Sequence, residues 1–250
     1  MTAIFDHFYK NRVALNVLAK GIDNARDVYR VAEKKVLIGV LSKKYPTVQH
    51  AADAMIEHGR ALDDAVSIGL GSGDSKQGKM VAEITKTYAG KHINQVFPLV
   101  GQTRANLGKQ NSWINALVTP TGLKGYVNIA TGPFSEKGEK AVIPVKTAIA
   151  LVRDMGGNAL KYFPMNGLSS KAEYQAVATA CGDEQFGLEP TGGIDKENFT
   201  EIVEIALAAN VPQVIPHVYS SIIDPDTGNT SLDDIDFLIN EMKRLVDNYE

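Results

Sequence analysis

The stretch Lys161-Tyr-Phe-Pro-Met-Asn-Gly167 places one lysine inside a short apolar run that ends at a proline. The aromatic and aliphatic residues of 159–163 favour a β-strand. An ammonium group is almost never fully buried without a partner. Lys161 therefore either faces water on an edge strand or has a specific task inside the protein. The rest of the chain decides between these two interpretations.

Short apolar runs alternate with amphipathic helical patterns along the whole chain. We expect strands at eight of these runs, which are 36–41, 65–70, 93–97, 113–119, 126–130, 159–163, 186–189 and 213–218. Strands that alternate with helices form parallel sheets through right-handed crossovers. Eight such units in 250 residues predict a (β/α)8 TIM barrel that forms a single domain, residues 1–250.

Residues that begin helices agree with this division of the chain. Thr47, Asp195 and Ser231 each precede a helical pattern and can cap its first turn, and Pro144 suits the first turn of another helix. The run 13–19 and the helical pattern 23–33 are additional to the eight units. We therefore expect a short extra N-terminal segment packed on the barrel, with a ninth strand in place of a weak one as the alternative.

The composition excludes several classes of protein. The net charge is -3, and no cluster of Lys and Arg interleaved with aromatic residues indicates a nucleic-acid binder. The single cysteine, Cys181, excludes an internal disulfide and a Cys-rich metal site, and its apolar surroundings indicate a small buried side chain. The spacing of the five histidines predicts no metal site. Without a long apolar run near the N-terminus, we expect a cytoplasmic protein with no membrane partner.

Polar residues stand near the ends of several predicted strands. In a barrel, alternate side chains point inward, and the chemistry gathers at the carboxyl ends of the strands. Lys161 and Phe163 share one face of their strand. We expect six polar residues to line a central cavity: Gln95, Asn115, Asn128, Lys161, Glu189 and His217.

A glycine turn follows the seventh predicted strand and suggests an anion site. Gly192 and Gly193 allow backbone N–H groups to approach an anion, and the helix that begins at Asp195 favours negative charge at its N-terminus. Ser220 and Ser221 follow the eighth strand, and loops at these two places commonly hold a phosphate in barrels. Alone, the turn would be read as an ordinary tight turn.

The glycine-rich stretch Gly69-Leu-Gly-Ser-Gly-Asp74 does not complete the dinucleotide fingerprint G-x-G-x-x-G, because Asp74 stands where the last glycine is needed. We expect it to be a loop that enters the barrel mouth, with Asp74 near the substrate.

The motifs Lys161-Tyr-Phe-Pro164 and Pro190-Thr-Gly-Gly-Ile194 resemble those of the class I 2-keto-3-deoxy-6-phosphogluconate aldolases. The resemblance is closer to a distinct branch, the KDGP aldolase family, and covers blocks along nearly the whole chain: 67–71, 94–97, 154–157, 161–167, 189–194 and 215–224. It implies cleavage of a small phosphorylated keto-sugar acid, 2-keto-3-deoxy-6-phosphogluconate, to pyruvate and glyceraldehyde 3-phosphate, without a cofactor. A homo-oligomeric assembly is also compatible with the resemblance.

The resemblance also implies roles for individual residues. Lys161 would form a Schiff base with the substrate, and Phe163 would pack beside the pyruvyl group. Thr191 would touch the substrate, while Gly192, Gly193 and a serine of the pair Ser220–Ser221 would hold the phosphate.

The chain departs from the better-known aldolases at two positions. Those enzymes carry a glutamate base and an arginine where this chain has Ser67 and Gly71. Glu189 lies on the same face as Thr191 and is our first choice for the general base, followed by His217 and Asp74. Arg104 is the expected partner of the substrate carboxylate. Two rival functions are a barrel isomerase or epimerase, and a sugar-phosphate-binding protein without turnover.

Overall fold

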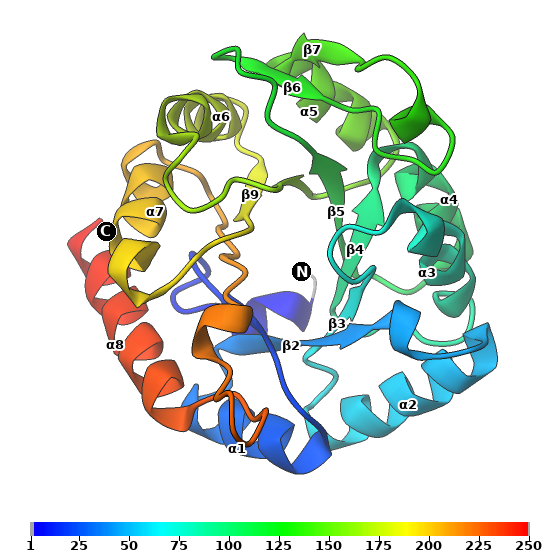
Figure 1. Ribbon diagram of the computed structural model, residues 1–250, viewed down its shortest axis with the longest axis vertical. Helices are drawn as coiled ribbons and strands as arrows, with labels where there is room; N and C mark the ends of the chain where they lie inside the picture. Colours follow the sequence, from blue (N-terminus) through cyan, green and yellow to red (C-terminus); the bar gives the residue numbers. More distant parts are fainter. Residues whose placement is uncertain (1–2, 250) are drawn as a thin grey trace.

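The computed structural model describes residues 3–249. Its centre is a parallel sheet of seven strands in the order β1-β2-β3-β4-β5-β8-β9, and Figure 1 shows this sheet curled around a central axis with helices outside it. The strands of this sheet are β1 (Leu15–Leu18), β2 (Val36–Leu41), β3 (Val66–Gly69), β4 (His92–Val96), β5 (Trp113–Val118), β8 (Ala159–Tyr162) and β9 (Gly187–Pro190). The strands are buried almost throughout, as expected for a parallel sheet covered by helices.

Helices connect successive strands and form the outer layer. They are α1 (Ile22–Val31), α2 (Val48–Ala61), α3 (Gly78–Ile84), α4 (Val100–Asn106), α5 (Val145–Asp154), α6 (Lys171–Asp183), α7 (Lys196–Ala208) and α8 (Leu232–Asn248). Three predicted caps are confirmed, because the side chains of Thr47, Asp195 and Ser231 accept hydrogen bonds from backbone N–H groups in the first turns of α2, α7 and α8. No helix within residues 3–249 is long and apolar enough to cross a membrane.

The segment expected as the eighth strand, residues 213–218, lies between β9 and β1. It pairs with both neighbours through isolated parallel bridges: Val214 with Leu188 and Val13, and His217 with Thr191 and Asn16. The structure thus has seven regular strands in its main sheet, and the eighth position is occupied by a segment that pairs only at separate points.

The barrel units follow the alternative stated for them, in which the extra N-terminal run supplies a strand in place of a weak one. The run 13–19 contains β1, a strand of the sheet, whereas 126–130 lies outside it. There β6 (Tyr126–Asn128) pairs antiparallel with β7 (Val142–Pro144). Burial explains why the run 13–19, and not 126–130, supplies a strand of the main sheet. Leu15 and Val17 are fully buried, whereas Tyr126 is 42% exposed.

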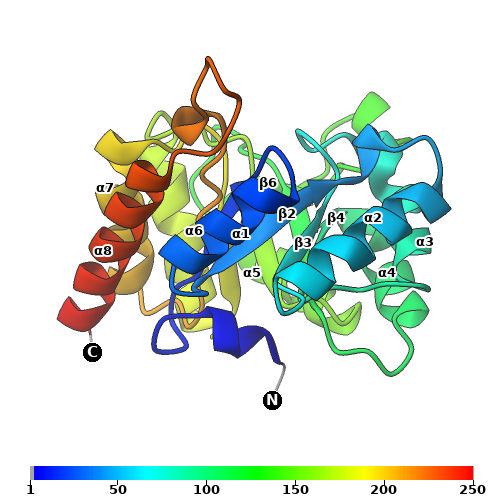
Figure 2. The same cartoon turned by 90° about the horizontal axis from the view of Figure 1, so that it is seen from below.

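An N-terminal segment does pack against the sheet, at residues 3–8. Ile4 and Phe8 are buried in a cluster with Trp113 and Ala159, the first residues of β5 and β8. The segment therefore covers the amino ends of the strands. Figure 2 shows it, in dark blue, at the end of the molecule opposite the orange loop that precedes α8.

Candidate active site

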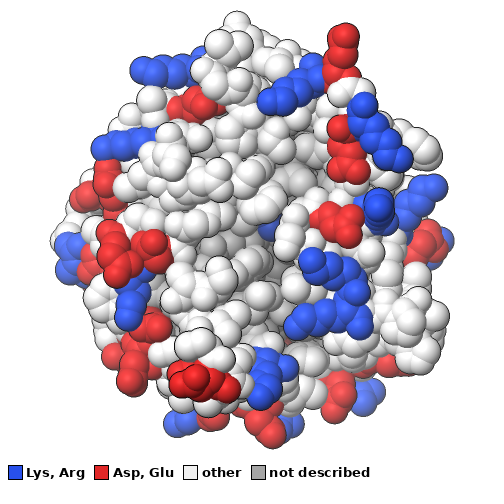
Figure 3. Space-filling model, in the orientation of Figure 1, with Lys and Arg blue, Asp and Glu red and all other residues white. Residues whose placement is uncertain are grey.

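A cavity of about 360 Å³ opens at the carboxyl ends of the strands. Figure 3 shows the molecule hollowed at this place, at the centre of the face. The cavity is lined by residues at the ends of β8 and β9, by the loop after β3, and by His217, Tyr219 and Ser220. Lys161 is the only Lys, Arg, Asp or Glu among the described lining residues. The prediction that Lys161 points into the interior is confirmed.

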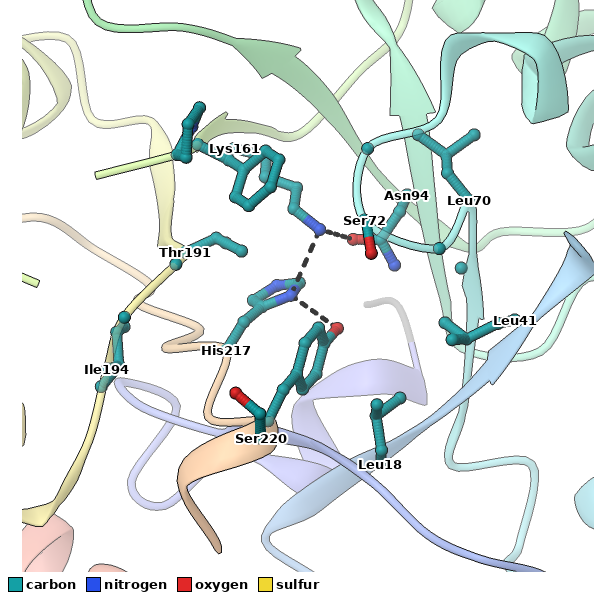
Figure 4. Close-up of a pocket in the computed structure, with 18 of the residues that line it drawn as sticks. Leu18, Leu41, Leu70, Ser72, Asn94, Lys161, Thr191, Ile194, His217 and Ser220 are labelled. Atoms are coloured by element: carbon teal, nitrogen blue, oxygen red, sulfur yellow. Dashed lines mark hydrogen bonds between the residues drawn. The ribbon is translucent and has the colours of Figure 1, made fainter. Parts of the chain in front are cut away.

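Lys161 is buried at the base of the cavity, with 7% of its surface exposed. Its Nζ donates to Asn94 Oδ1 at 2.8 Å and lies 3.4 Å from His217 Nδ1, as Figure 4 shows. Burial lowers the pKa of the ammonium group to about 8, although the nearby Glu189 carboxylate opposes the shift. A lysine with this pKa exists partly as the neutral amine at neutral pH, which is the nucleophilic form.

The amide of Asn94 has its orientation fixed by its neighbours. Oδ1 faces the ammonium group, so Nδ2 donates to Ser67 Oγ at 2.9 Å and to the Ile68 carbonyl at 3.0 Å. Ser67 Oγ also accepts from Asn16 Nδ2 at 2.8 Å. With both lone pairs of the hydroxyl occupied, its hydrogen is directed to His92 Nδ1, 2.7 Å away. The ring proton of His92 is therefore on Nε2.

Glu189 is completely buried and receives hydrogen bonds from four side chains. His92 Nε2 and His217 Nε2 approach its carboxylate to 3.0 and 2.9 Å, Trp113 Nε1 donates at 2.9 Å, and Asn115 Nδ2 donates as well. Burial alone would raise the pKa of Glu189, but the two histidines outweigh it and hold the pKa well below its usual range. The carboxylate is thus ionised, and it does not line the cavity.

His217 stands between this carboxylate and the cavity. Its Nε2 donates to Glu189, and its Nδ1 faces Lys161 and the Tyr219 hydroxyl, which lies 2.9 Å away. Burial and the neighbouring Lys161 lower the pKa of His217, so the imidazole is neutral at physiological pH. The arrangement presents an unprotonated Nδ1 atom to the cavity, with the carboxylate behind it holding the tautomer.

The trio His92, Glu189 and His217 also has the composition of a metal site, since one ligand atom of each lies within 4.8 Å of the others. The proton positions argue against this use. Both Nδ1 atoms face hydrogen-bond donors, so both Nε2 atoms carry hydrogen and offer no lone pair. The hydrogen bonds of the trio are those of a carboxylate held by two imidazole N–H groups.

Phe163 packs between two glycine loops at the cavity wall. A Cβ atom on Gly73 would lie 2.9 Å from its ring, and one on Gly192 would lie 3.2 Å from it. Both glycines have positive φ, so a side chain at either position would be strained as well as crowded. Thr191, Gly192, Gly193 and Ser220 also line the cavity, as expected. Ser221 does not, because its Oγ donates to the Ile194 carbonyl at 2.7 Å.

The expectation that Arg104 binds the substrate is wrong. Helix α4 begins after β4 and runs back along the sheet, which carries Arg104 to the amino ends of the strands. Its guanidinium binds the carbonyls of Gly156 and Ser112 and the side chain of Asn158, all in the segments before β5 and β8.

Four further polar residues do not line this cavity. Asn115 lies beneath it and donates to Asn94 Oδ1 and Glu189. Asp74 caps the 3-10 turn Ser75–Gln77 by accepting from Lys76 N. Gln95 points toward the helices and binds Gly78 O and Thr103 Oγ1, because His92 and Asn94 occupy the inward face of β4. Asn128 belongs to the β6–β7 pair, whose antiparallel strands lie outside the main sheet.

The sequence interpretation missed five residues of this site: Asn16, Ser67, His92, Asn94 and Tyr219. Asn94 and His92 share the inward face of β4. The sequence interpretation assigned Gln95 to that face, and moving the assignment by one residue would have identified both. Tyr219 follows His217 by two residues and contacts it directly.

The model of the KDGP aldolase family matches residues 9–226 of the chain. The chain belongs to the KDGP aldolase family. A Salmonella typhimurium protein named 2-dehydro-3-deoxy-phosphogluconate aldolase is 43% identical over 244 residues, covering 96% of this chain and 98% of that protein. The chain is therefore an aldolase, and the resemblance inferred from its motifs is confirmed.

Solved structures of low sequence identity share the fold of this KDGP aldolase family member. A GGGPS from Thermoplasma volcanium aligns with a TM-score of 0.53 at 13% identity over 98% of both chains. A mutant tryptophan synthase α-subunit from Pyrococcus furiosus aligns with a TM-score of 0.54 at 11% identity, covering 95% of this chain and 98% of that one. These likenesses concern the TIM-barrel-like arrangement of strands and helices alone.

Proposed function

We propose that this aldolase cleaves 2-dehydro-3-deoxy-6-phosphogluconate to pyruvate and D-glyceraldehyde 3-phosphate through a Schiff base on Lys161. The observation that carries the proposal is a buried lysine of lowered pKa that is the only charged side chain among the described lining residues of the cavity. The name of the Salmonella relative supports the choice of substrate.

The reaction begins at Lys161 Nζ. The neutral amine attacks the C2 carbonyl carbon of the substrate, a proton taken up from water lets the hydroxyl of the carbinolamine leave as water, and a protonated imine remains. Asn94 accepts a hydrogen bond from Nζ and so holds it at the base of the cavity. The positive imine then withdraws electrons from the C3–C4 bond.

His217 is the general base in this proposal. Its Nδ1 takes the proton of the C4 hydroxyl, the C3–C4 bond breaks, and the bonding electrons form an enamine with the imine. The aldehyde leaves, and the same nitrogen returns a proton to C3 before water releases pyruvate. Glu189 acts behind His217 as a positioning residue, since it lies outside the cavity lining and is already bonded to four donors.

The remaining lining residues bind the ends of the substrate. The amides of Gly192 and Gly193 and the hydroxyl of Ser220 receive the phosphate, and the Phe163 ring covers the pyruvyl group. We also infer that the sheet closes as an eight-stranded barrel. The bridges that residues 213–218 make with β9 and β1 support this inference.

Borohydride reduction in the presence of pyruvate tests the mechanism. We expect mass spectrometry to find a reduced pyruvyl adduct on the peptide that contains Lys161. The variant Lys161→Met should form none, and Lys171→Met, at an exposed lysine paired with Glu201, should retain it. A barrel isomerase or a sugar-phosphate-binding protein predicts no adduct in the wild-type enzyme, and that result would refute the proposed mechanism.

A further inference from the structure

The proposed substrate carries two anionic groups, a carboxylate and a phosphate, but Lys161 is the one Lys or Arg among the described lining residues of the cavity. The protonated imine keeps that single positive charge at C2, and Arg104 lies at the opposite end of the sheet. An anion removed from water needs hydrogen-bond donors in compensation. In the described part of the chain, those donors must therefore be uncharged groups of the cavity wall.

The loop after β3 offers such donors. Gly71, Ser72 and Gly73 all line the cavity and have φ angles of 83°, 53° and 67°. Within residues 3–249, none of their three backbone N–H groups donates a hydrogen bond to another backbone group. Successive free amides in a turn form a concave site for an anion. The exposed hydroxyl of Ser72 adds a fourth donor beside them.

Gly71, where the resemblance places the arginine of the better-known aldolases, has a φ of 83° and lies close to the side chain of Lys43. A Cβ atom on Gly71 would lie 2.5 Å from the side chain of Lys43. The alkyl stem of Lys43 therefore covers the loop from outside. Figure 3 shows Lys and Arg side chains grouped on one side of the hollow, where they favour the approach of an anion.

The position of Lys161 Nζ shows which anion this loop receives. Nζ binds Asn94, and Asn94 binds Ser67 and Ile68 of β3, the strand that leads into the loop. Figure 4 places Ser72 beside the end of Lys161 and Asn94, with Thr191 and Ile194 on the other side of the cavity. The carboxylate carbon is bonded directly to the imine carbon, so the carboxylate must lie close to Nζ.

We propose that the amides of Gly71, Ser72 and Gly73, together with the Ser72 hydroxyl, bind the carboxylate of the 2-keto acid. The Gly192–Gly193 loop on the opposite wall then takes the phosphate. The inference rests on the proposed function. It makes the loop after β3 the element that selects 2-keto acids over uncharged ketones.

Two aspartate variants separate the two anion sites. Ser72→Asp places a negative charge in the β3 loop, where the exposed side chain and the positive φ angle both tolerate aspartate. Ser220→Asp is the matched variant on the opposite wall, also at an exposed serine. Imine formation is followed by borohydride trapping with pyruvate and with methyl pyruvate, which lacks the charge. Inhibition of cleavage of the phosphorylated substrate by inorganic phosphate is measured in parallel.

For Ser72→Asp we expect the half-saturating pyruvate concentration to rise at least about tenfold, through repulsion of like charges, while methyl pyruvate changes less than about twofold. Ser220→Asp should raise the KM for the phosphorylated substrate and weaken inhibition by inorganic phosphate, with the half-saturating pyruvate concentration nearly unchanged. Equal effects of Ser72→Asp on both ketones, or a pyruvate defect confined to Ser220→Asp, would overturn the assignment.

Failure of the proposed carboxylate site can be distinguished from failure of the proposed function. If the wild-type enzyme traps no pyruvate at all, the Schiff-base mechanism fails. The carboxylate site is then tested by ligand-observed NMR of non-covalent pyruvate binding to Lys161→Met. Binding that Ser72→Asp abolishes supports the site, and binding that it leaves unchanged refutes it.

Discussion

The lowered pKa of Lys161 predicts how fast the enzyme forms an imine at each pH. An ordinary lysine has a pKa of 10.5, and burial lowers that of Lys161 to about 8. At pH 7 the neutral fraction is then about 10%, compared with about 0.03% for an unperturbed lysine. The lowered pKa therefore makes the reactive amine roughly 300 times more abundant.

The assay is the initial rate of borohydride trapping with a fixed, subsaturating concentration of pyruvate, measured from pH 6 to pH 10. The neutral fraction grows as pH rises, so the rate should increase about tenfold per unit below the pKa and level off above pH 8. N-acetyl-lysine amide, treated in the same way, corrects for the pH dependence of the reduction itself. A midpoint near 10 would show that the amine is not desolvated and would refute the reasoning.

Three further predictions follow from the same hydrogen bonds. His217→Gln should lower the rate of substrate cleavage by about 100-fold to 10,000-fold but keep pyruvate trapping on Lys161; equal loss in both assays would contradict its role as base. Glu189→Gln should lower the free energy of unfolding by about 3–5 kcal/mol in urea titrations, because an amide N–H would face one of its four donors; unchanged stability would mean that the carboxylate is not ionised there. Lys161→Met should raise the unfolding free energy at pH 7 by about 3 kcal/mol, since the folded-state pKa lies below the unfolded value and the penalty is fully present below pH 8. That gain should vanish as pH rises through 10.5, and a gain independent of pH would disprove its electrostatic origin.

Much of the fold follows from apolar periodicity, because buried parallel strands leave a strong signal in the sequence. Residues 36–41 and 113–119 are such runs, and the structure forms β2 and β5 there. The error between 13–19 and 126–130 arose because both are short apolar runs interrupted by one asparagine. Tertiary packing distinguishes the two runs. Helix α1 follows β1 directly, as in the other barrel units, whereas β6 pairs antiparallel with β7.

The site was predictable where residue alternation within a strand was read correctly. Lys161 and Glu189 are neighbours in register on β8 and β9, and both point inward as expected. Gln95 was misplaced because an inward face shifted by one residue sends every side chain of a strand to the other side. Arg104 was misplaced because nearness in sequence to the end of β4 says nothing about where a returning helix carries the side chain.

The segment that covers the amino ends of the strands has a consequence for the chemistry at the other end. Phe5 and Phe8 pack against Trp113 with ring centroids 6.4 and 6.2 Å apart, and Trp113 donates to Glu189. Phe5 and Phe8 therefore form part of the dielectric surroundings of the nucleophile, although they precede it by more than 150 positions. Trimming them would admit water beneath Glu189 and weaken the desolvation that lowers the pKa of Lys161.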